Sequence, residues 1–448
     1  MLGVNVWVDW VGQCLLWLYG VRVSVSVLLG TGLVVAVVYV LLRSYSQVKI
    51  WCHPTQTNLA IVRGLSTLRR GRWRVPFWVT SGHLQTIFTP LVKPSPHPDY
   101  SRILLQNPNC GGTIVCDIHD NTTVFERRAR FNFPFITLFS DHSLHPPSSA
   151  RGYHQLRPLV FIVPGISSNR SSAYIRSAVH ALGVDGCKVV IVNHRGGEFE
   201  APQLSSAQIF TVGGSTDLRT AIEHFRNEEA PGTPFVLVGF SLGGNICVNY
   251  TSEYEDVGTE LVGCVSICQG YDGRHGVEIL EKDQPFYSRV LLNKLQRIVQ
   301  QHEAVFRNHP KISWEAVMAA RTVPEFDTAF SAPLHGYASA DDYYTHHSCI
   351  TRIGRARVPL LLINSTDDPF IPADLFNLSI QAAKNQTNII AVHTSKGGHL
   401  GFWEGGLFRP YSKSWIDRLL CEFAALMSVL GPGAIFRSED PVMSPLRQ

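Results

Sequence analysis

The sequence lacks both a long run of basic residues and any closely paired cysteines. Its net charge is +4 over 448 residues, which is too small to indicate a nucleic-acid partner. Its ten cysteines form no CxxC pair and no CxxC…HxxxH spacing, so neither a zinc site nor a disulfide framework is indicated. We expect no metal and no cofactor. We expect Cys247, Cys264 and Cys268, which lie in apolar segments, to be buried thiols.

The chain also lacks the excess of charge that keeps a protein unfolded. Charged residues make up 17% of it and hydrophobic residues 45%, a composition that favours folding around a sizeable core. A length of 448 residues would allow several domains, yet α/β folds with insertions commonly use that length as one unit.

One long uncharged run lies near the amino end. Residues 23–42, VSVSVLLGTGLVVAVVYVLL, carry no charge and lie between Arg22 and Arg43. A helix of that length rises by about 30 Å, which is the thickness of the hydrocarbon layer of a bilayer. A secretory signal has a shorter apolar region followed by a small-residue cleavage site. The run therefore favours an uncleaved, single-pass anchor in the endoplasmic reticulum or plasma membrane.

The residues on either side of this run indicate on which side of the membrane the catalytic part lies, and a later segment indicates contact with lipid. Arg43 and Lys49 follow the run, whereas Arg22 and the amino terminus precede it, so the count favours a cytosolic catalytic part by a single charge. Residues 69–78, RRGRWRVPFW, interleave basic and aromatic side chains. This mixture suits a lipid headgroup layer, and it suits equally well a surface segment packed on the domain.

Short apolar runs alternate with helical stretches through the rest of the chain. This alternation indicates a mostly parallel, doubly wound α/β sheet covered by helices on both faces. The predicted strands lie within residues 158–165, 187–197, 234–244, 261–268, 358–365 and 388–394, and the first helices within residues 173–182 and 216–225. Residues 112–131 are predicted to form a hairpin or meander.

The same pattern predicts four parts of the chain and one insertion. Residues 1–50 are the expected anchor, 51–111 a connector and N-terminal extension, 112–430 the α/β domain, and 431–448 a disordered tail. Mostly helical residues separate the fourth predicted strand from the fifth. We expect them, at about residues 273–350, to form a helical cap over the carboxyl edge of the sheet.

The stretch VLVGFSLGGNI contains a serine between a predicted strand and a predicted helix. Gly239, Ser241 and Gly243 form the Gly-x-Ser-x-Gly pattern of a nucleophile elbow, in which a sharp turn exposes the serine Oγ at the edge of the sheet. A glycine-rich turn with an incidental serine is the alternative. The position between strand and helix favours a catalytic nucleophile at Ser241.

A serine hydroxyl is a weak nucleophile, so this interpretation requires a base and an acid later in the chain, in the order Ser, Asp, His. NSTDDPFIP follows the fifth strand and offers Asp367 and Asp368. We prefer Asp368 because an Asp-x-apolar-apolar-Pro loop begins there, and we expect Asp367 to cap the loop. KGGHLGF follows the last strand and presents His399 as the base.

The transition state of such chemistry also needs two N–H donors directed at the developing oxyanion. We expect one donor at the backbone of Leu242, immediately after the nucleophile and at a helix amino end. We expect the second at Ile166, where Gly165 permits close approach. His194 and His83 are interpreted as structural or positioning residues.

Several stretches resemble the α/β-hydrolase-domain-containing lipases, a group that includes the bacterial YheT-like hydrolases. The resemblance lies in SGHLQTIF, PGISSNRSSAYIR, VNHRGG, VGFSLGGNI and KGGHLGFWEG, and it covers roughly residues 78–425. It implies an α/β-hydrolase fold with Ser241 as nucleophile, Asp368 as acid and His399 as base. Members similar to this chain are membrane-anchored esterases of acylglycerols, usually described with the amino end inside, which is opposite to the charge count.

The group also contains a His-x-x-x-x-Asp acyltransferase pattern. Here His180 and Asp185 fit that pattern in HALGVD, but their place at the end of a predicted helix favours coincidence. The sequence therefore predicts a membrane-anchored serine hydrolase of lipid esters, with monoacylglycerol as the first substrate to consider. An acyltransferase or phospholipase on the same triad, and a non-catalytic protein that binds a lipid or steroid ligand, remain as alternatives.

Glycosylation sequons can show on which side of the membrane the catalytic part lies. Among the Asn-x-Ser/Thr sites, Asn169 and Asn364 lie beside the predicted catalytic loops, where a glycan would obstruct them. A glycan at Asn121 or Asn385 would place the catalytic part in the lumen or outside the cell. The sequence leaves the oligomeric state open.

Overall fold

The computed structural model describes residues 31, 34, 44–93, 95–123, 157–197, 204 and 206–431. The apolar run of residues 23–42, apart from residues 31 and 34, lies outside these residues, as do the tail from residue 432 and the second half of the predicted hairpin. The end of the part expected to be the anchor belongs instead to strand β1 (Tyr45–Trp51) of the sheet. Within the described residues, no helix has both the length and the apolar character needed to cross a membrane.

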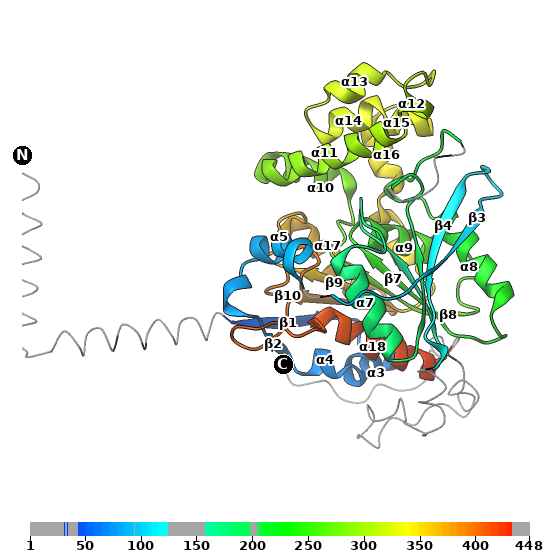
Figure 1. Cartoon of the computed structure of the whole chain (residues 1–448). Helices are drawn as coiled ribbons and strands as arrows, with labels where there is room; N and C mark the ends of the chain where they lie inside the picture. The colour runs from blue at the N-terminus through cyan, green and yellow to red at the C-terminus, as the bar shows by residue number, and fades with distance from the viewer. Residues whose placement is uncertain are drawn as a thin grey trace, which may run out of the picture.

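A ten-stranded mixed sheet runs through the molecule (Figure 1) in the order β2-β1-β10-β9-β8-β7-β5-β6-β4-β3. Its six central strands, from β10 to β6, are parallel, and antiparallel strands complete both edges. The strands are β1 Tyr45–Trp51, β2 Arg72–Arg74, β3 Ser101–Gln106, β4 Thr113–His119, β5 Leu159–Val163, β6 Lys188–Val192, β7 Phe235–Phe240, β8 Leu261–Ile267, β9 Leu360–Ser365 and β10 Ile389–Thr394. The prediction of a mostly parallel sheet is confirmed.

Helices cover both faces of this sheet because its central strands bury alternate side chains on opposite sides. In β5, Val160 and Ile162 face one core, whereas Leu159, Phe161 and Val163 face the other. The first core is covered by α3 (Gln56–Gly64), α4 (Ser66–Arg69), α7 (Ala173–Val184) and α18 (Trp415–Leu430), and the second by α8 (Thr216–Glu228), α9 (Leu242–Glu253) and α17 (Ala373–Asn385).

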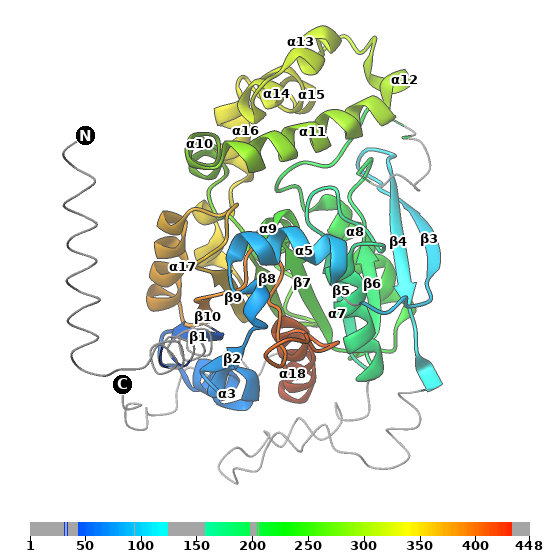
Figure 2. The same ribbon diagram turned by 60° about the vertical axis from the view of Figure 1, so that its left-hand side comes forward.

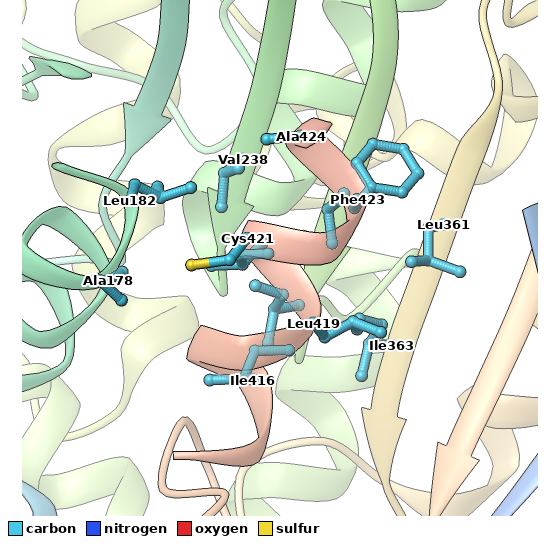
Figure 3. Packing of buried hydrophobic residues seen from close by; sticks show 14 of the residues in the cluster. Ala178, Leu182, Val238, Leu361, Ile363, Ile416, Leu419, Cys421, Phe423 and Ala424 are labelled. Atoms are coloured by element: carbon cyan, nitrogen blue, oxygen red, sulfur yellow. The ribbon is translucent and has the colours of Figure 1, made fainter. Parts of the chain in front are cut away.

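Figure 3 shows how the first core is filled. Leu419 and Ala424 of α18 lie among Leu182 of α7, Val238 of β7 and Ile363 of β9. All of these side chains are at most 1% exposed. Each buried leucine or isoleucine contributes about 1.5–3 kcal/mol to folding relative to an exposed one. Cys247, Cys264 and Cys268 are also buried and form no disulfide, as predicted.

Seven helices, all within the described residues, follow between β8 and β9 and sit above one end of the sheet (Figures 1 and 2). They occupy the stretch expected to form a helical insertion. The helices are α10 Gly273–Asp283, α11 Pro285–Gln301, α12 Glu303–Phe306, α13 Trp314–Ala319, α14 Val323–Ala329, α15 Ser331–His335 and α16 Ala340–His347. The cap has a hydrophobic core of its own, which includes Leu292, Phe306 and Phe326.

The stretch expected to be a connector, residues 51–111, is instead part of the sheet and its coverings. β1 ends at Trp51 and pairs with β10, and β2 and β3 also belong to the sheet. The stretch further contains α5 (Gly82–Val92), which follows a single 3₁₀ turn at Phe77–Val79. These strands are hard to predict from the sequence because strands at or near the edge of a sheet bury only some of their side chains and so lack a continuous apolar run.

Candidate active site

Ser241 lies at the turn from β7 into α9, in a backbone conformation that L-residues rarely adopt. Its φ is 53° and its ψ is −116°, and its N–H donates to the carbonyl of Ile267 at 2.7 Å. A Cβ at Gly239 would lie 2.3 Å from the Gly243 carbonyl oxygen, and one at Gly243 would lie 2.1 Å from that of Val163. Glycine is therefore required on both sides of the serine, as the elbow pattern predicts.

His399 lies on the loop after β10, within hydrogen-bond distance of Ser241. Its Nε2 is 3.0 Å from Ser241 Oγ, and its Nδ1 is 2.9 Å from Asp368 Oδ2. Because a carboxylate only accepts, Nδ1 carries the proton and Nε2 is free to accept from the serine hydroxyl. The structure thus brings together the three side chains singled out from the sequence.

The Asp368 carboxylate is held on both of its oxygens. Oδ1 accepts from the backbone N–H of Phe370 at 2.8 Å and of Ile371 at 3.3 Å, while Oδ2 faces the imidazole. The side chain has no exposed surface. The Phe370 ring also packs on His399, with ring centroids 4.7 Å apart. These contacts fix the plane of the imidazole relative to the serine.

Asp367 has a different position and a different task. Its Oδ1 accepts from the Gly398 N–H at 2.8 Å and from the Ser365 hydroxyl at 2.5 Å. It therefore ties the loop of the histidine to the end of β9. Burial raises the pKa of this carboxyl above its usual value, and the bonds from Ser365 and Gly398 partly offset that effect. The structure agrees with the expectation that Asp367 caps the loop.

The two expected oxyanion donors border the same cavity as Ser241. Leu242 begins α9, so its N–H is among the helix amides without an intrahelical partner. Ile166 lies in the turn after β5. Next to it, the Gly165 N–H donates to the Tyr174 hydroxyl at 3.0 Å. A Cβ on Gly165 would approach the Ser241 Cβ to 3.3 Å, so this turn passes directly beside the nucleophile.

His194 and His83 have the positioning roles expected for them. His194 is buried and donates through Nε2 to the Pro164 carbonyl at 2.7 Å, which fixes the turn before Ile166. Burial lowers its pKa, so the ring is neutral. His83 of α5 lies 2.7 Å from the Tyr287 hydroxyl of α11 and so links the body of the protein to the cap.

A cavity of about 680 Å³ extends from Ser241 into the cap. Its body side is formed by Ile166 and Ser168 with Thr86 and Pro90 of α5. Its cap side is largely apolar, and the side chains there are Val277, Leu280, Leu291, Leu295, Ile298, Val299, Val323, Phe326 and Phe330. A volume of this size holds a lipid acyl chain with a small headgroup.

Several ionisable side chains interrupt the lining, and three of them are Arg176, Lys294 and Asp327. Arg176 of α7 is held by the Ser95 hydroxyl at 2.7 Å. Lys294 of α11 lies among the apolar cap residues, and desolvation lowers the pKa of its ammonium group. Asp327 of α14 is buried, and burial raises its pKa to about 6 although the hydroxyls of Ser331 and Tyr344 donate to it.

Within the described residues, one cluster brings three metal-ligand types together: Cys268, Asp368 and His399, whose ligand atoms lie within 4.8 Å of one another. The hydrogen bond between the carboxylate and Nδ1 already uses two of these groups. Burial, followed by the charge of Asp368, raises the pKa of the Cys268 thiol well above its ordinary value. A thiol that stays protonated is a poor metal ligand.

Some residues of the site were missed in the sequence. Thr86 Oγ1 accepts the His399 N–H at 2.8 Å while its own hydroxyl donates to Gly82. Thr86 lies in the stretch SGHLQTIF, which carries the resemblance but gives no role. The other sequence candidates, His180 and Asp185, do not line the cavity. Asp185 instead pairs with Lys413 at 3.5 Å.

Comparison with known proteins places this geometry in a family. Residues 158–406, more than half of the chain, match the model of the alpha/beta hydrolase fold. The chain belongs to this family. It is 27% identical to abhydrolase domain-containing protein 2 of Drosophila melanogaster, over 86% of this chain and 93% of that protein.

Two further relatives carry names that state an activity. The monoacylglycerol lipase ABHD2 of Danio rerio is 28% identical, over 87% of this chain and 89% of its own. The human phospholipase ABHD3 is 29% identical over 78% of both chains. Family membership and these similarities support an ABHD2-like α/β-hydrolase that acts as a carboxylic ester hydrolase.

Proposed function

We propose that the protein hydrolyses acyl esters of lipids, with monoacylglycerol as its preferred class of substrate, through Ser241, His399 and Asp368. The observation that carries this proposal is the pair of hydrogen bonds that joins the serine hydroxyl to the imidazole and the imidazole to the buried carboxylate. An adjoining apolar cavity of about 680 Å³ supports a substrate with an acyl chain.

The reaction begins with proton transfer from the Ser241 hydroxyl to Nε2 of His399 as the oxygen attacks the ester carbonyl. The N–H groups of Leu242 and Ile166 stabilise the negative charge on the carbonyl oxygen. The tetrahedral intermediate collapses, the C–O bond to glycerol breaks, and His399 returns the proton to the departing alcohol. A water molecule, deprotonated by the same imidazole, then attacks the acyl-enzyme and releases the fatty acid. Asp368 orients the imidazole in both halves.

The membrane anchor is part of this proposal. Residues 23–42 have the length and composition of a bilayer-spanning helix, and a substrate dissolved in lipid explains the use of such a segment. We propose a single-pass protein of the endoplasmic reticulum or plasma membrane.

Replacing the nucleophile tests the proposal. Ser241→Ala in the full chain, reconstituted in vesicles, is expected to lose both labelling by a fluorophosphonate probe and hydrolysis of monoacylglycerol. Rates should fall by about 10³-fold or more because the oxyanion donors alone supply little turnover. A matched control is Ser168→Ala, since that serine borders the same cavity but has no part in the proposed chemistry. Undiminished hydrolysis by Ser241→Ala would refute the mechanism.

A phospholipid ester is the second candidate substrate. Arg176 and Lys294 line the cavity, and a cation there would pair with a phosphate group. One of the relatives is named a phospholipase. Assaying the same reconstituted enzyme with monoacylglycerol and with lysophosphatidylcholine of equal chain length ranks the two by kcat/KM.

A further inference from the structure

Exposed large hydrophobic side chains gather on one side of the molecule. Among the described residues, eight of the eleven lie in three segments and are called here the α5 face; they are Phe77, Leu84, Ile87, Leu91, Val92, Phe286, Phe408 and Tyr411. Leu91, Phe408 and Phe286 are 69%, 65% and 64% exposed. Water-exposed apolar groups at this density mark an interaction surface.

Contacts join the three segments into one face. The Phe77 ring packs edge-on against Phe408 with centroids 5.4 Å apart, and the Phe77 N–H donates to Leu407. In α5, Leu84, Ile87 and Leu91 follow the helical spacing that places them on one side. The contact of His83 with Tyr287 brings the start of α11, and with it Phe286, next to α5. Figure 2 turns this side toward the viewer, with α5 between the cap helices above and the β1–β2 edge below.

The three segments that contain the α5 face carry charges of one sign, and the exposed Asp283 stands just before the second of them. Residues 69–93, 285–297 and 405–416, which contain the face, include no aspartate or glutamate. Arg72, Arg289 and Arg409 in these segments are exposed. Apolar residues beside arginines suit the boundary between acyl chains and anionic headgroups. We therefore favour a lipid surface over a protein partner as the occupant of this face.

Residues 69–78, RRGRWRVPFW, are predicted from the sequence either to contact lipid headgroups or to pack on the domain, and different residues of the motif fit each interpretation. Trp73 is 3% exposed and stacks on Trp415 with centroids 4.5 Å apart, so this part is packed on the domain. Arg72 and Phe77 are exposed and belong to the region of the α5 face. Only the outward half of the motif is available to a headgroup layer.

The first described residue after the apolar run, Ser44, is hydrogen-bonded to a residue close to this face in the chain. Residues 23–42 end two positions before Ser44, whose carbonyl accepts the Val75 N–H at 2.7 Å. Phe77 follows two residues later. If the run is the proposed bilayer anchor, the chain enters the domain within a few residues of the α5 face, and this side of the molecule is then turned toward the lipid.

We infer that the α5 face docks on the bilayer surface and opens the active-site cavity to lipid entering between α5 and the cap. Thr86, Thr89 and Pro90 of α5 line the cavity, and Leu291 of α11 lines it from the cap side. The other side of α5 carries the exposed residues of the α5 face. The helix thus separates lipid from the site by its own width. The inference rests on the proposed function for its substrate but not for its contact with lipid.

Photocrosslinking tests the contact without using activity. The full chain carries p-benzoylphenylalanine in place of Leu91 or Phe408, or in place of Leu104 as the control, and is reconstituted in vesicles of equal parts phosphatidylcholine and phosphatidylserine with a radiolabelled phospholipid. Leu104 is 52% exposed and lies on β3, at the opposite edge of the sheet. Illumination is expected to transfer label at positions 91 and 408 but not at 104. Label no greater at 91 and 408 than at 104, or adducts there with a second copy of the chain, would overturn the inference.

A kinetic experiment separates docking from chemistry. In the double variant Leu91→Glu with Phe408→Glu, kcat/KM for monoacylglycerol in vesicles is expected to fall about tenfold, because two carboxylates oppose contact with the lipid. Hydrolysis of a water-soluble short-chain ester is expected to stay unchanged, as is all activity of Leu104→Glu. Undiminished hydrolysis by Ser241→Ala with lipid crosslinks retained at positions 91 and 408 would uphold docking and refute only the proposed catalytic mechanism. Equal vesicle kinetics in the double variant and the control would count against the inference.

Discussion

Two adjacent aspartates follow β9, and their contacts assign them different tasks. Asp368 faces Nδ1 of His399, whereas Asp367 accepts from the Gly398 backbone. Asp368→Asn is expected to lower kcat by about 10³–10⁴-fold, because an amide favours the imidazole tautomer that cannot accept from the serine. Asp367→Asn is the matched variant and should retain far more activity, since it disturbs only the loop. Fluorophosphonate labelling rates of both variants check this, and equal losses would contradict the assignment.

Single residues also show which parts of the site are readable from sequence. Ser241 was predictable because the elbow requires glycine at fixed neighbouring positions. Asp368 and His399 were predictable because each follows an apolar strand in a fixed chain order. Thr86 was not, because it meets His399 across more than three hundred residues, and no local pattern encodes such a contact. Cys268 was assigned to the core, and its position beside the triad also depends on the fold alone.

At the scale of elements, the cap is held together by a buried acid. Asp327 of α14 accepts from Ser331 of α15 and from Tyr344 of α16, and burial raises its pKa to about 6 from a usual 3.8. The folded state therefore keeps a proton between those values that the unfolded chain has released. This contribution to stability grows as the pH falls from 7 toward 4 and is lost as the pH rises through 6.

Removing that charge gives a measurable change. Asp327→Asn is expected to raise the free energy of unfolding at pH 7 by about 2–3 kcal/mol, since the amide needs no desolvation of a charge and still bonds both hydroxyls. At pH 5 the folded carboxyl is mostly protonated while the unfolded one is still ionised, so the gain should fall to roughly half, and it should vanish only below pH 4. Thermal unfolding midpoints of both proteins at the two pH values check this. A variant that is destabilised equally at both would show that hydrogen bonding, not charge, controls the cap.

The central strands were predicted and the edge strands were not, for one physical reason. β5 to β10 are buried on both faces and read as unbroken apolar runs. β1 and β3 lie near the margins of the sheet and carry mostly half-buried or exposed side chains, so YSQVKIW and SRILLQ resemble ordinary surface sequence. Their pairing with β10 and β4 depends on the strand order of the whole sheet, and this order cannot be predicted from the residues of β1 and β3 alone.

At the scale of the whole molecule, the start of the catalytic domain lies before β1. β1 pairs with β10, and Ser46 and Gln47 bond the loop at Ser395 and Lys396 that leads to His399. A chain that begins at residue 44 is expected to fold and to keep its activity on a soluble ester. A chain that begins at residue 54 is expected to lose both, because it exposes β10 as an unpaired edge. Thermal unfolding and fluorophosphonate labelling of the two truncations distinguish them; equal behaviour would show β1 to be dispensable.

If the apolar run is the proposed bilayer anchor, its short connection to β1 limits where this enzyme works. Only Arg43 stands between residue 42 and the buried Ser44, which leaves almost no slack in the chain. Under the proposed bilayer anchor, such a short connection would confine the enzyme to substrate that diffuses in two dimensions within the adjoining leaflet. Its rate would then follow the mole fraction of ester in that leaflet rather than the bulk concentration, and lipids of a neighbouring membrane would stay out of its reach.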